Sequence, residues 1–176
     1  GELIDERSIV NGIVGLMATG GSTNHALHIP AIAAAAGIVV TPQDFAEISH
    51  VTPLLARIYP NGPADVNHFH AAGGMSFLVK QLLAGGLLHG DARGVAGPIT
   101  DYAQEPVLSD TGLTWRPAPD ASADTDVLRP LDNPFSEDGG LRLVEGLLGE
   151  GVAKVSAVKP AHRVVEAPAI VFESQE

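Results

Sequence analysis

The chain contains, at residues 7–24, the stretch RSIVNGIVGLMATGGSTN, and the expected architecture is built outward from it. Apolar residues recur at helical spacing through residues 7–19, which predicts an amphipathic helix. Gly20 and Gly21 then end this helix, and Ser22 or Thr23 can cap a second one. The stretch therefore predicts two helices joined by a glycine turn.

The first of these helices contains two glycines, and the second contains a proline. Gly12 and Gly15 lie inside the first, where glycine costs helix stability, so we interpret them as points of close helix contact. We expect the second helix to run to about Ala36 and to stop at Gly37. Pro30 lies inside it and removes a backbone hydrogen bond, which predicts a kink.

The rest of the chain changes character along its length, which predicts a mixed α/β fold. Residues 41–49 begin with the signature Thr-Pro-Gln-Asp of a helix start, and residues 74–84 have the spacing of a longer helix. Residues 92–138 are rich in Pro, Gly, Asp and Thr, which indicates a crossing segment. Short β-like runs lie at Ile38–Val40, Leu141–Val144, Val152–Val158 and Val164–Phe172.

Composition excludes several classes of function. The net charge of −11 argues against nucleic-acid partners and against anionic membranes, and the acidic excess of the second half fits a solubilising surface. The chain has no cysteine, and so no disulfide, thiol nucleophile or thiolate metal site. The longest apolar run, at residues 29–40, is too short to span a bilayer. Because the chain begins at Gly1 without Met, we expect it to be an internal segment of a longer protein.

The turn Gly20–Asn24 is the first candidate site. Two glycines allow close approach of a ligand to the backbone, and unpaired N–H groups at a helix start favour a carboxylate or phosphate. The alternative is an ordinary interhelical turn with a Ser22 or Thr23 cap, and the residues taken alone favour it. The Walker spacing of a nucleotide-binding loop is absent.

The second candidate is the run ADVNHFH at residues 64–70. In an extended strand His68 and His70 would point to the same side, as a metal site or a proton-transfer pair requires. Substrate contact or a structural hydrogen bond is the interpretation that we favour over metal binding. His25 and His28, three residues apart on the second helix, are expected to be structural.

Several motifs together resemble the dihydroxy-acid and 6-phosphogluconate dehydratase family. They are ATGGSTN at 18–24, PLLARIYPNG at 53–62, NHFHAAGGM at 67–75, GLLH at 86–89, KVSAVK at 154–159 and HRVVEAPA at 162–169. Their order and spacing hold over nearly the whole chain. The NHFH segment and the PNG turn are similar to the branch that acts on 6-phosphogluconate.

The resemblance implies a hydro-lyase that converts 6-phospho-D-gluconate to 2-keto-3-deoxy-6-phosphogluconate in the cytoplasm, as part of the Entner–Doudoroff pathway. Its implied cofactor is an iron–sulfur cluster, 4Fe–4S with 2Fe–2S as the alternative, and a divalent cation is left open. In the family the cluster cysteines lie upstream of these motifs and the catalytic serine lies downstream. No position here matches either, so no catalytic residue or metal ligand is expected in this chain, which alone would be inactive.

The resemblance also implies a site, a domain plan and a partner. Substrate-binding positions carry over to Gly20, Gly21, Ser22, Thr23, Asn24, His68 and His70. Residues 1–91 would end an N-terminal α/β domain, 92–138 would cross over, and 139–176 would start a β-barrel-like C-terminal domain. The ligand would be a sugar-acid phosphate and the full-length enzyme a homodimer. Two alternatives stay open: another sugar acid or a dihydroxy acid as the substrate, and a non-catalytic anion-binding module.

Overall fold

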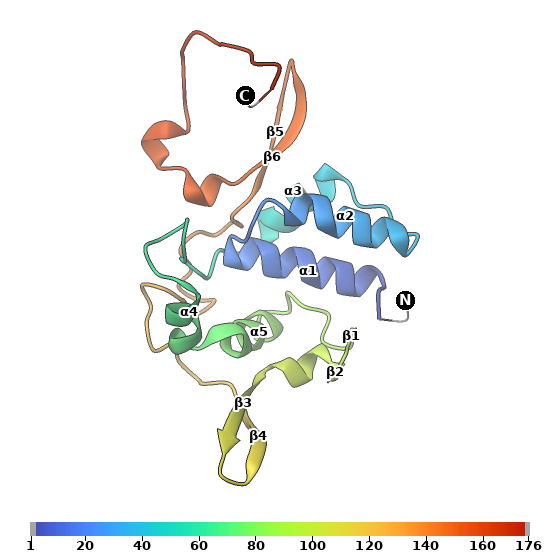
Figure 1. The fold of residues 1–176 in the computed structure, drawn as a ribbon, viewed down its shortest axis with the longest axis vertical. Coiled ribbons are helices and arrows are strands. Elements are labelled where there is room, and N and C mark those ends of the chain that lie inside the picture. Colours follow the sequence, from blue (N-terminus) through green and yellow to red (C-terminus); the bar gives the residue numbers. More distant parts are fainter. Residues whose placement is uncertain (1–2, 175–176) are drawn as a thin grey trace.

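The chain has a mixed α/β structure, seen in a computed structural model that describes residues 3–174 (Figure 1). Within these residues lie five α-helices, three two-stranded antiparallel sheets and three short 3₁₀ helices. The helices are α1 (Glu6–Thr19), α2 (His25–Ala35), α3 (Pro42–Val51), α4 (Val66–Ala72) and α5 (Gly74–Ala84). The strands pair as β1 (Arg93–Gly94) with β2 (Gly97–Pro98), β3 (Gln104–Ser109) with β4 (Gly112–Pro117), and β5 (Arg142–Gly146) with β6 (Gly149–Ala153). The 3₁₀ helices are Ile99–Tyr102, Val155–Ala157 and Pro160–His162.

Local capping residues set the helix starts. Asp5, Thr41 and Asp65 each accept a hydrogen bond from the third backbone N–H of α1, α3 and α4, and each takes part in a reciprocal capping box. Pro42 follows Thr41 at the first position of α3, where a missing N–H costs nothing. These short-range signals explain why the predicted starts of α1 and α3 are confirmed.

Helix α1 lies between two helical layers, with α2 and α3 on one side and α4 and α5 on the other (Figure 1). Its Ile13 and Met17 are buried in one apolar cluster with Phe45 and Leu141. Its opposite face contributes to a second cluster, made mainly by α4, α5 and the segments around residues 55 and 128. The buried side chains of that cluster are Val14, Ala18, Leu55, Ala56, Phe69, Ala72, Phe77, Leu78, Leu82, Val127 and Leu128. The end of α1 is therefore fixed from both sides.

The segment after α3 runs extended alongside residues 127–136, which lead towards β5. Isolated bridges join Leu54 to Ser136 and Ala56 to Leu128. The Arg57 N–H donates to the Val127 carbonyl at 2.8 Å. This pairing carries the chain past the end of α1, so residues 57–61 and 139–156 meet there.

The two longer hairpins lie at opposite ends of an elongated molecule. The β3–β4 hairpin projects at one end, and β5–β6 with the C-terminal segment lies at the other (Figure 1). No helix among residues 3–174 is long and apolar enough to cross a membrane.

Several local expectations were wrong. Residues 38–40 form no strand and Val39 is 85% exposed, because no described segment pairs with them. Residues 164–172 also lack a partner strand and stay irregular and exposed, and the expected strand 152–158 ends at Ala153. A Cβ at Gly12 or Gly15 would meet nothing within 4 Å, so neither is a helix contact point. By contrast, α5 has the predicted bounds, and α2 continues through Pro30 to Ala35.

Candidate functional site

The turn after α1 is held in a conformation that requires glycine. Gly20 has a φ of 56° and ψ of 43°, in the left-handed region that side chains with a Cβ avoid. The Gly20 N–H donates to the Met17 carbonyl at 3.3 Å, and the Gly21 N–H to the Leu16 carbonyl at 3.1 Å. These bonds satisfy the last carbonyls of α1 and direct the chain into α2.

The start of α2 is closed by the turn itself. The Asn24 N–H donates to Ser22 Oγ at 3.2 Å, and the His25 N–H donates to the Ser22 carbonyl at 3.0 Å. The Ala26 N–H donates to the Thr23 carbonyl at 2.9 Å. The expected N-cap at Ser22 or Thr23 was wrong: Asn24 occupies the N-cap position without a side-chain cap, and the Ser22 hydroxyl acts within the turn instead. Since these three N–H groups already donate within the turn, an anion would need its positive partner elsewhere.

A positively charged side chain that shares a cavity with the turn is that of Lys154. The turn forms one wall of a cavity of about 510 Å³, whose lining residues are Thr19, Gly20, Gly21, Ser22, Thr23, Ile58, Tyr59, Pro60, Val66, Phe69, Met75 and Lys154. Lys154 is the one charged residue among them. It makes no ion pair within residues 3–174, and its burial lowers the pKa of its ammonium group. A partly desolvated cation beside the Ser22 and Thr23 hydroxyls suits an anionic, hydroxylated ligand.

A polar network joins the turn to the segment that carries Lys154. Asn61 Nδ2 donates to the Gly20 carbonyl at 2.9 Å, and Ser156 Oγ donates to Asn61 Oδ1 at 2.9 Å. The Ser156 N–H donates to the Gly140 carbonyl at 3.2 Å, and the Gly140 N–H to the Met17 carbonyl at 3.1 Å. Three segments far apart in the sequence therefore meet at this point.

The contact leaves no room for larger residues. A Cβ built on Gly20 would overlap the Asn61 amide, and one built on Gly140 would lie 2.5 Å from the Gly20 Cα. Both glycines are buried. This close approach explains why the two positions lack side chains where the turn meets residues 139–156.

The histidine segment is a helix, so the extended conformation in which His68 and His70 would face the same side does not occur. Asp65 caps α4, and His68 Nδ1 lies 2.8 Å from Asp65 Oδ1. Residues two apart on a helix point in different directions, so His68 and His70 do not converge. The Asp65 cap was the local signal that predicts this helix. Neither histidine lines the turn cavity, and neither does Asn24, whereas Gly20–Thr23 do.

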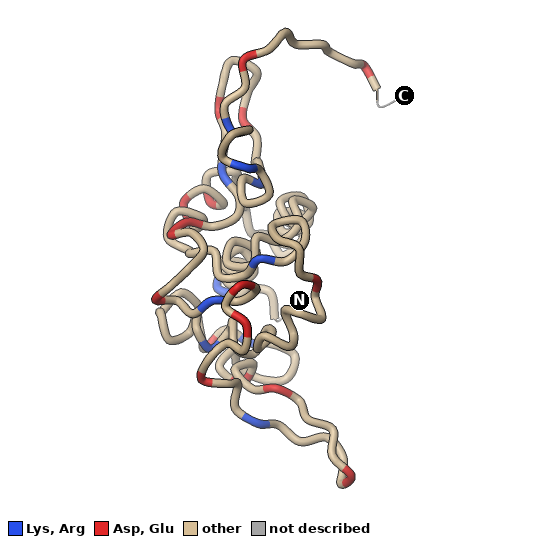
Figure 2. Tube along the Cα trace, turned by 90° about the vertical axis from the view of Figure 1, so that its left-hand side faces the viewer, with Lys and Arg blue, Asp and Glu red and all other residues tan. Residues whose placement is uncertain are grey.

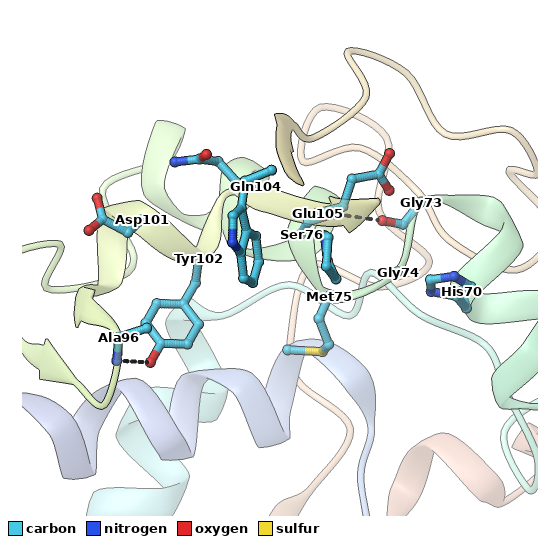
Figure 3. Close-up of a pocket in the computed structure, with 12 residues that line it drawn as sticks. His70, Gly73, Gly74, Met75, Ser76, Ala96, Asp101, Tyr102, Gln104 and Glu105 are labelled. Carbon is cyan, nitrogen blue, oxygen red and sulfur yellow. Dashed lines mark hydrogen bonds between the residues drawn. The ribbon is translucent and has the colours of Figure 1, made fainter. Parts of the chain in front are cut away.

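His70 instead lines a neighbouring cavity of about 650 Å³, between the α4–α5 junction and residues 96–115 (Figure 3). Its aromatic lining is Tyr102 and Trp115, and the Ala96 N–H donates to Tyr102 Oη at 3.2 Å. Met75 lines this cavity and the turn cavity, so the two adjoin there. His25 and His28 are exposed on α2, and His25 Nδ1 lies 3.0 Å from the Ser22 carbonyl, in keeping with a structural role.

The described residues do not fit an iron–sulfur cluster or a closed cation site. Clusters are held by cysteine thiolates, and the chain has no cysteine. Within residues 3–174 no group of three or more His, Asp or Glu side chains is placed to hold a metal ion.

Comparison with known proteins places these motifs in one family. The family model described as dihydroxy-acid/6-phosphogluconate dehydratase N-terminal matches residues 1–102, and its C-terminal counterpart matches residues 126–176. The chain belongs to this family. It is 63% identical over 175 residues to a phosphogluconate dehydratase of Pseudomonas aeruginosa and 52% identical over 176 residues to that of Escherichia coli strain K12. A dihydroxy-acid dehydratase of Polaromonas naphthalenivorans is 39% identical over 178 residues. Each match covers 99% of this chain, and the chain spans 29% of the length of each relative.

Sequence reasoning did not single out Lys154, Asn61 or Ser156 as site residues. Asn61 and Ser156 are 95 positions apart, and nothing local in the sequence reports their contact. The available signal was that both lie within family motifs, PLLARIYPNG and KVSAVK, and that the second begins with a lysine.

Proposed function

We propose that the chain is the substrate-binding segment of a hydro-lyase that converts 6-phospho-D-gluconate to 2-keto-3-deoxy-6-phosphogluconate, within the Entner–Doudoroff pathway. The observation that carries this proposal is the convergence of Lys154 with the Gly20–Thr23 turn, which joins residues from both family regions in one cavity. The relatives named phosphogluconate dehydratase are 48–63% identical to this chain, above the 39% of the dihydroxy-acid dehydratase, which favours the phosphorylated sugar acid.

The proposed roles follow from the chemistry of dehydration. Removal of water from a 2,3-dihydroxy acid needs a base for the C2 proton and a held leaving hydroxyl at C3. We assign Lys154 to the substrate carboxylate, since charge-assisted hydrogen bonds are the strong ones in a desolvated site. The Ser22 and Thr23 hydroxyls are assigned to sugar hydroxyls, and Asn61 and Ser156 position the lysine. His68, His70 and Asn24 stay proposed substrate contacts, through closure of the rest of the protein over α4 and α2.

The proposal places the remaining chemistry outside this chain. The base, and the ligands of an iron–sulfur cluster of 4Fe–4S or 2Fe–2S type, belong to the rest of the full-length protein, as would those of a divalent cation. Such a cluster supplies a Lewis acid for the leaving hydroxyl when bound. The 176-residue chain alone is therefore proposed to be inactive.

The proposal also covers the domain plan, the cellular compartment and the oligomeric state. Residues 1–91, 92–138 and 139–176 are assigned to an N-terminal α/β domain, a crossing segment and the start of a β-barrel-like domain. The two-stranded β5–β6 sheet has unpaired edges and residues 164–172 expose apolar side chains, and both features support the last assignment because further strands would cover them. We propose a cytoplasmic homodimer.

The test uses the full-length protein. Formation of 2-keto acid is measured with 6-phosphogluconate, gluconate and dihydroxyisovalerate, for wild type, Lys154→Met and the exposed control Lys159→Met. We expect 6-phosphogluconate to have the highest kcat/KM, and Lys154→Met to lower it by roughly 100-fold, about 3 kcal/mol. Lys159→Met should match wild type. A higher kcat/KM for dihydroxyisovalerate would move the assignment to the dihydroxy-acid branch.

A further inference from the structure

A further pocket, with a polar lining, includes both residues of the Asn61–Ser156 contact. Its volume is about 390 Å³. The residues that line it are Leu54, Arg57, Asn61, Phe135, Ser136, Gly139, Arg142, Val155, Ser156 and Arg163. Three of them are arginines, and none of the described lining residues is acidic. The chain has 21 Asp and Glu residues but only 10 Lys and Arg, so this local excess of positive charge runs against its composition. Figure 2 shows Lys and Arg positions gathered where the extended C-terminal part of the chain meets the helical part.

We propose that this arginine pocket, formed by Arg57, Arg142 and Arg163, binds the phosphate group of a phosphorylated sugar acid. The inference rests on the proposed function and assigns a subsite to it. Guanidinium groups present paired N–H donors that match phosphate oxygens, and they stay charged at all physiological pH values. The Ser136 hydroxyl, which also lines the pocket, adds a neutral donor that an anion can use.

Arg57 is the most available of the three cations. Its backbone N–H is anchored to the Val127 carbonyl at 2.8 Å, which fixes where the side chain starts. Its guanidinium lies 5.3 Å from the centre of the Phe135 ring, a cation–π distance. Within residues 3–174 it forms no ion pair. The Phe135 ring, which Arg129 also approaches at 4.1 Å, contacts Arg57 without neutralising it.

The other two arginines, Arg163 and Arg142, determine the net charge of the pocket. Arg163 donates through Nε to the Val158 carbonyl at 3.2 Å and through Nη2 to the Val155 carbonyl at 3.3 Å, which leaves Nη1 for a ligand. Arg142 pairs with Asp138. Three guanidinium groups and one carboxylate leave two positive charges, which match the charge of about −2 on a phosphate monoester at neutral pH.

The arginine pocket and the turn cavity are built on the same network. Asn61 and Ser156 line the arginine pocket, while Gly20, which is hydrogen-bonded to Asn61, and Lys154 line the turn cavity. Lys154 and Ser156 are two residues apart, on a segment that the Gly140 contact anchors. This common wall gives one protein region separate sites for the two anionic groups of the same substrate.

Calorimetry on the full-length protein tests the assignment. Wild type, Arg57→Gln, Arg57→Lys, Arg163→Gln and the exposed control Arg93→Gln are titrated with 6-phosphogluconate and with gluconate. We expect Arg57→Gln and Arg163→Gln to weaken 6-phosphogluconate binding at least 10-fold while gluconate binding stays unchanged. Arg57→Lys keeps the charge but loses the paired N–H donors of the guanidinium group. Its affinity for 6-phosphogluconate should therefore lie between those of wild type and Arg57→Gln. Arg93→Gln should bind like wild type.

Two further measurements separate the pocket assignment from the proposed function. They are turnover of 6-phosphogluconate by the full-length protein and displacement of bound 6-phosphogluconate by inorganic phosphate. If the full-length protein dehydrates 6-phosphogluconate but both Gln variants bind it like wild type, the pocket assignment is wrong and the proposed function stands. If it does not dehydrate 6-phosphogluconate, the proposed function fails. Phosphate competition that is lost in the two Gln variants and kept in Arg93→Gln would still support a phosphate site in that case.

Discussion

Gly20 is a residue at which a single methyl group should destabilise the fold. Its φ of 56° costs other residues roughly 1–2 kcal/mol, and a Cβ there would overlap the Asn61 amide. We expect Gly20→Ala to lower the free energy of unfolding by about 2–4 kcal/mol in urea denaturation. Gly12→Ala is the matched control. A Cβ at Gly12 meets nothing within 4 Å, so the helix should gain about 0.5–1 kcal/mol. Equal effects at the two positions would contradict the tight turn.

The Asn61–Ser156 hydrogen bond offers a second test at residue scale. Asn61 is 9% exposed, so its removal takes a donor from the Gly20 carbonyl and leaves the Ser156 hydroxyl with the Gly140 carbonyl as its acceptor. We expect Asn61→Ala and Ser156→Ala each to cost about 1–3 kcal/mol, with a coupling of about 1 kcal/mol in the double-mutant cycle. Asn67→Ala, on the exposed side of α4, serves as control. Additive effects of the two substitutions would show that the bond does not form.

Helix α4 should give the chain a measurable acid sensitivity. Backbone hydrogen bonding from His68, followed by its side-chain bond, lowers the pKa of Asp65 below the ordinary value of 3.8. A lowered carboxyl pKa stabilises the fold above the ordinary value, and this contribution is lost as pH falls through the lower folded pKa. We therefore expect the loss below about pH 4, the usual range of aspartate.

The Asp65→Asn variant isolates this effect. Asparagine still accepts the capping N–H bonds but does not titrate, so α4 should persist with a flatter dependence of stability on pH. Asp65→Ala removes the cap and should be less stable than Asp65→Asn at every pH. Urea midpoints measured between pH 3 and pH 7 compare the three proteins. An Asp65→Asn slope as steep as that of wild type would contradict the assignment.

The same elements show where sequence reasoning succeeds and where it stops. The starts of α1 and α3 and both bounds of α5 could be predicted, because caps and apolar periodicity act within a few residues. Residues 38–40 are apolar yet form no strand, since a strand needs a partner that periodicity does not reveal. The Gly20–Thr23 turn was found from local chemistry. Lys154 was not, because its place in the site depends on contacts such as Ser156 with Asn61 across 95 positions.

At the scale of the whole molecule, many large apolar side chains are exposed on a protein with a high net negative charge. Helix α2 is apolar around its circumference, with Leu27 71% and Ile32 50% exposed, and the irregular segment 164–172 exposes further apolar side chains. Exposed apolar side chains favour association, whereas the net charge of −11 opposes it through repulsion that salt screens. The balance between these terms should therefore depend on ionic strength.

We expect the 176-residue chain to associate reversibly, with a mass by light scattering that rises with protein concentration and with added salt. Leu27→Lys should weaken this association, because it puts a charge on the exposed face of α2. Val95→Lys is the matched control: it makes the same change in net charge at a position that is 91% exposed in the turn between β1 and β2. If both substitutions reduce the mass equally, net charge alone governs association. A mass that stays monomeric at all concentrations and salt levels would show that the apolar face of α2 has no tendency to pair.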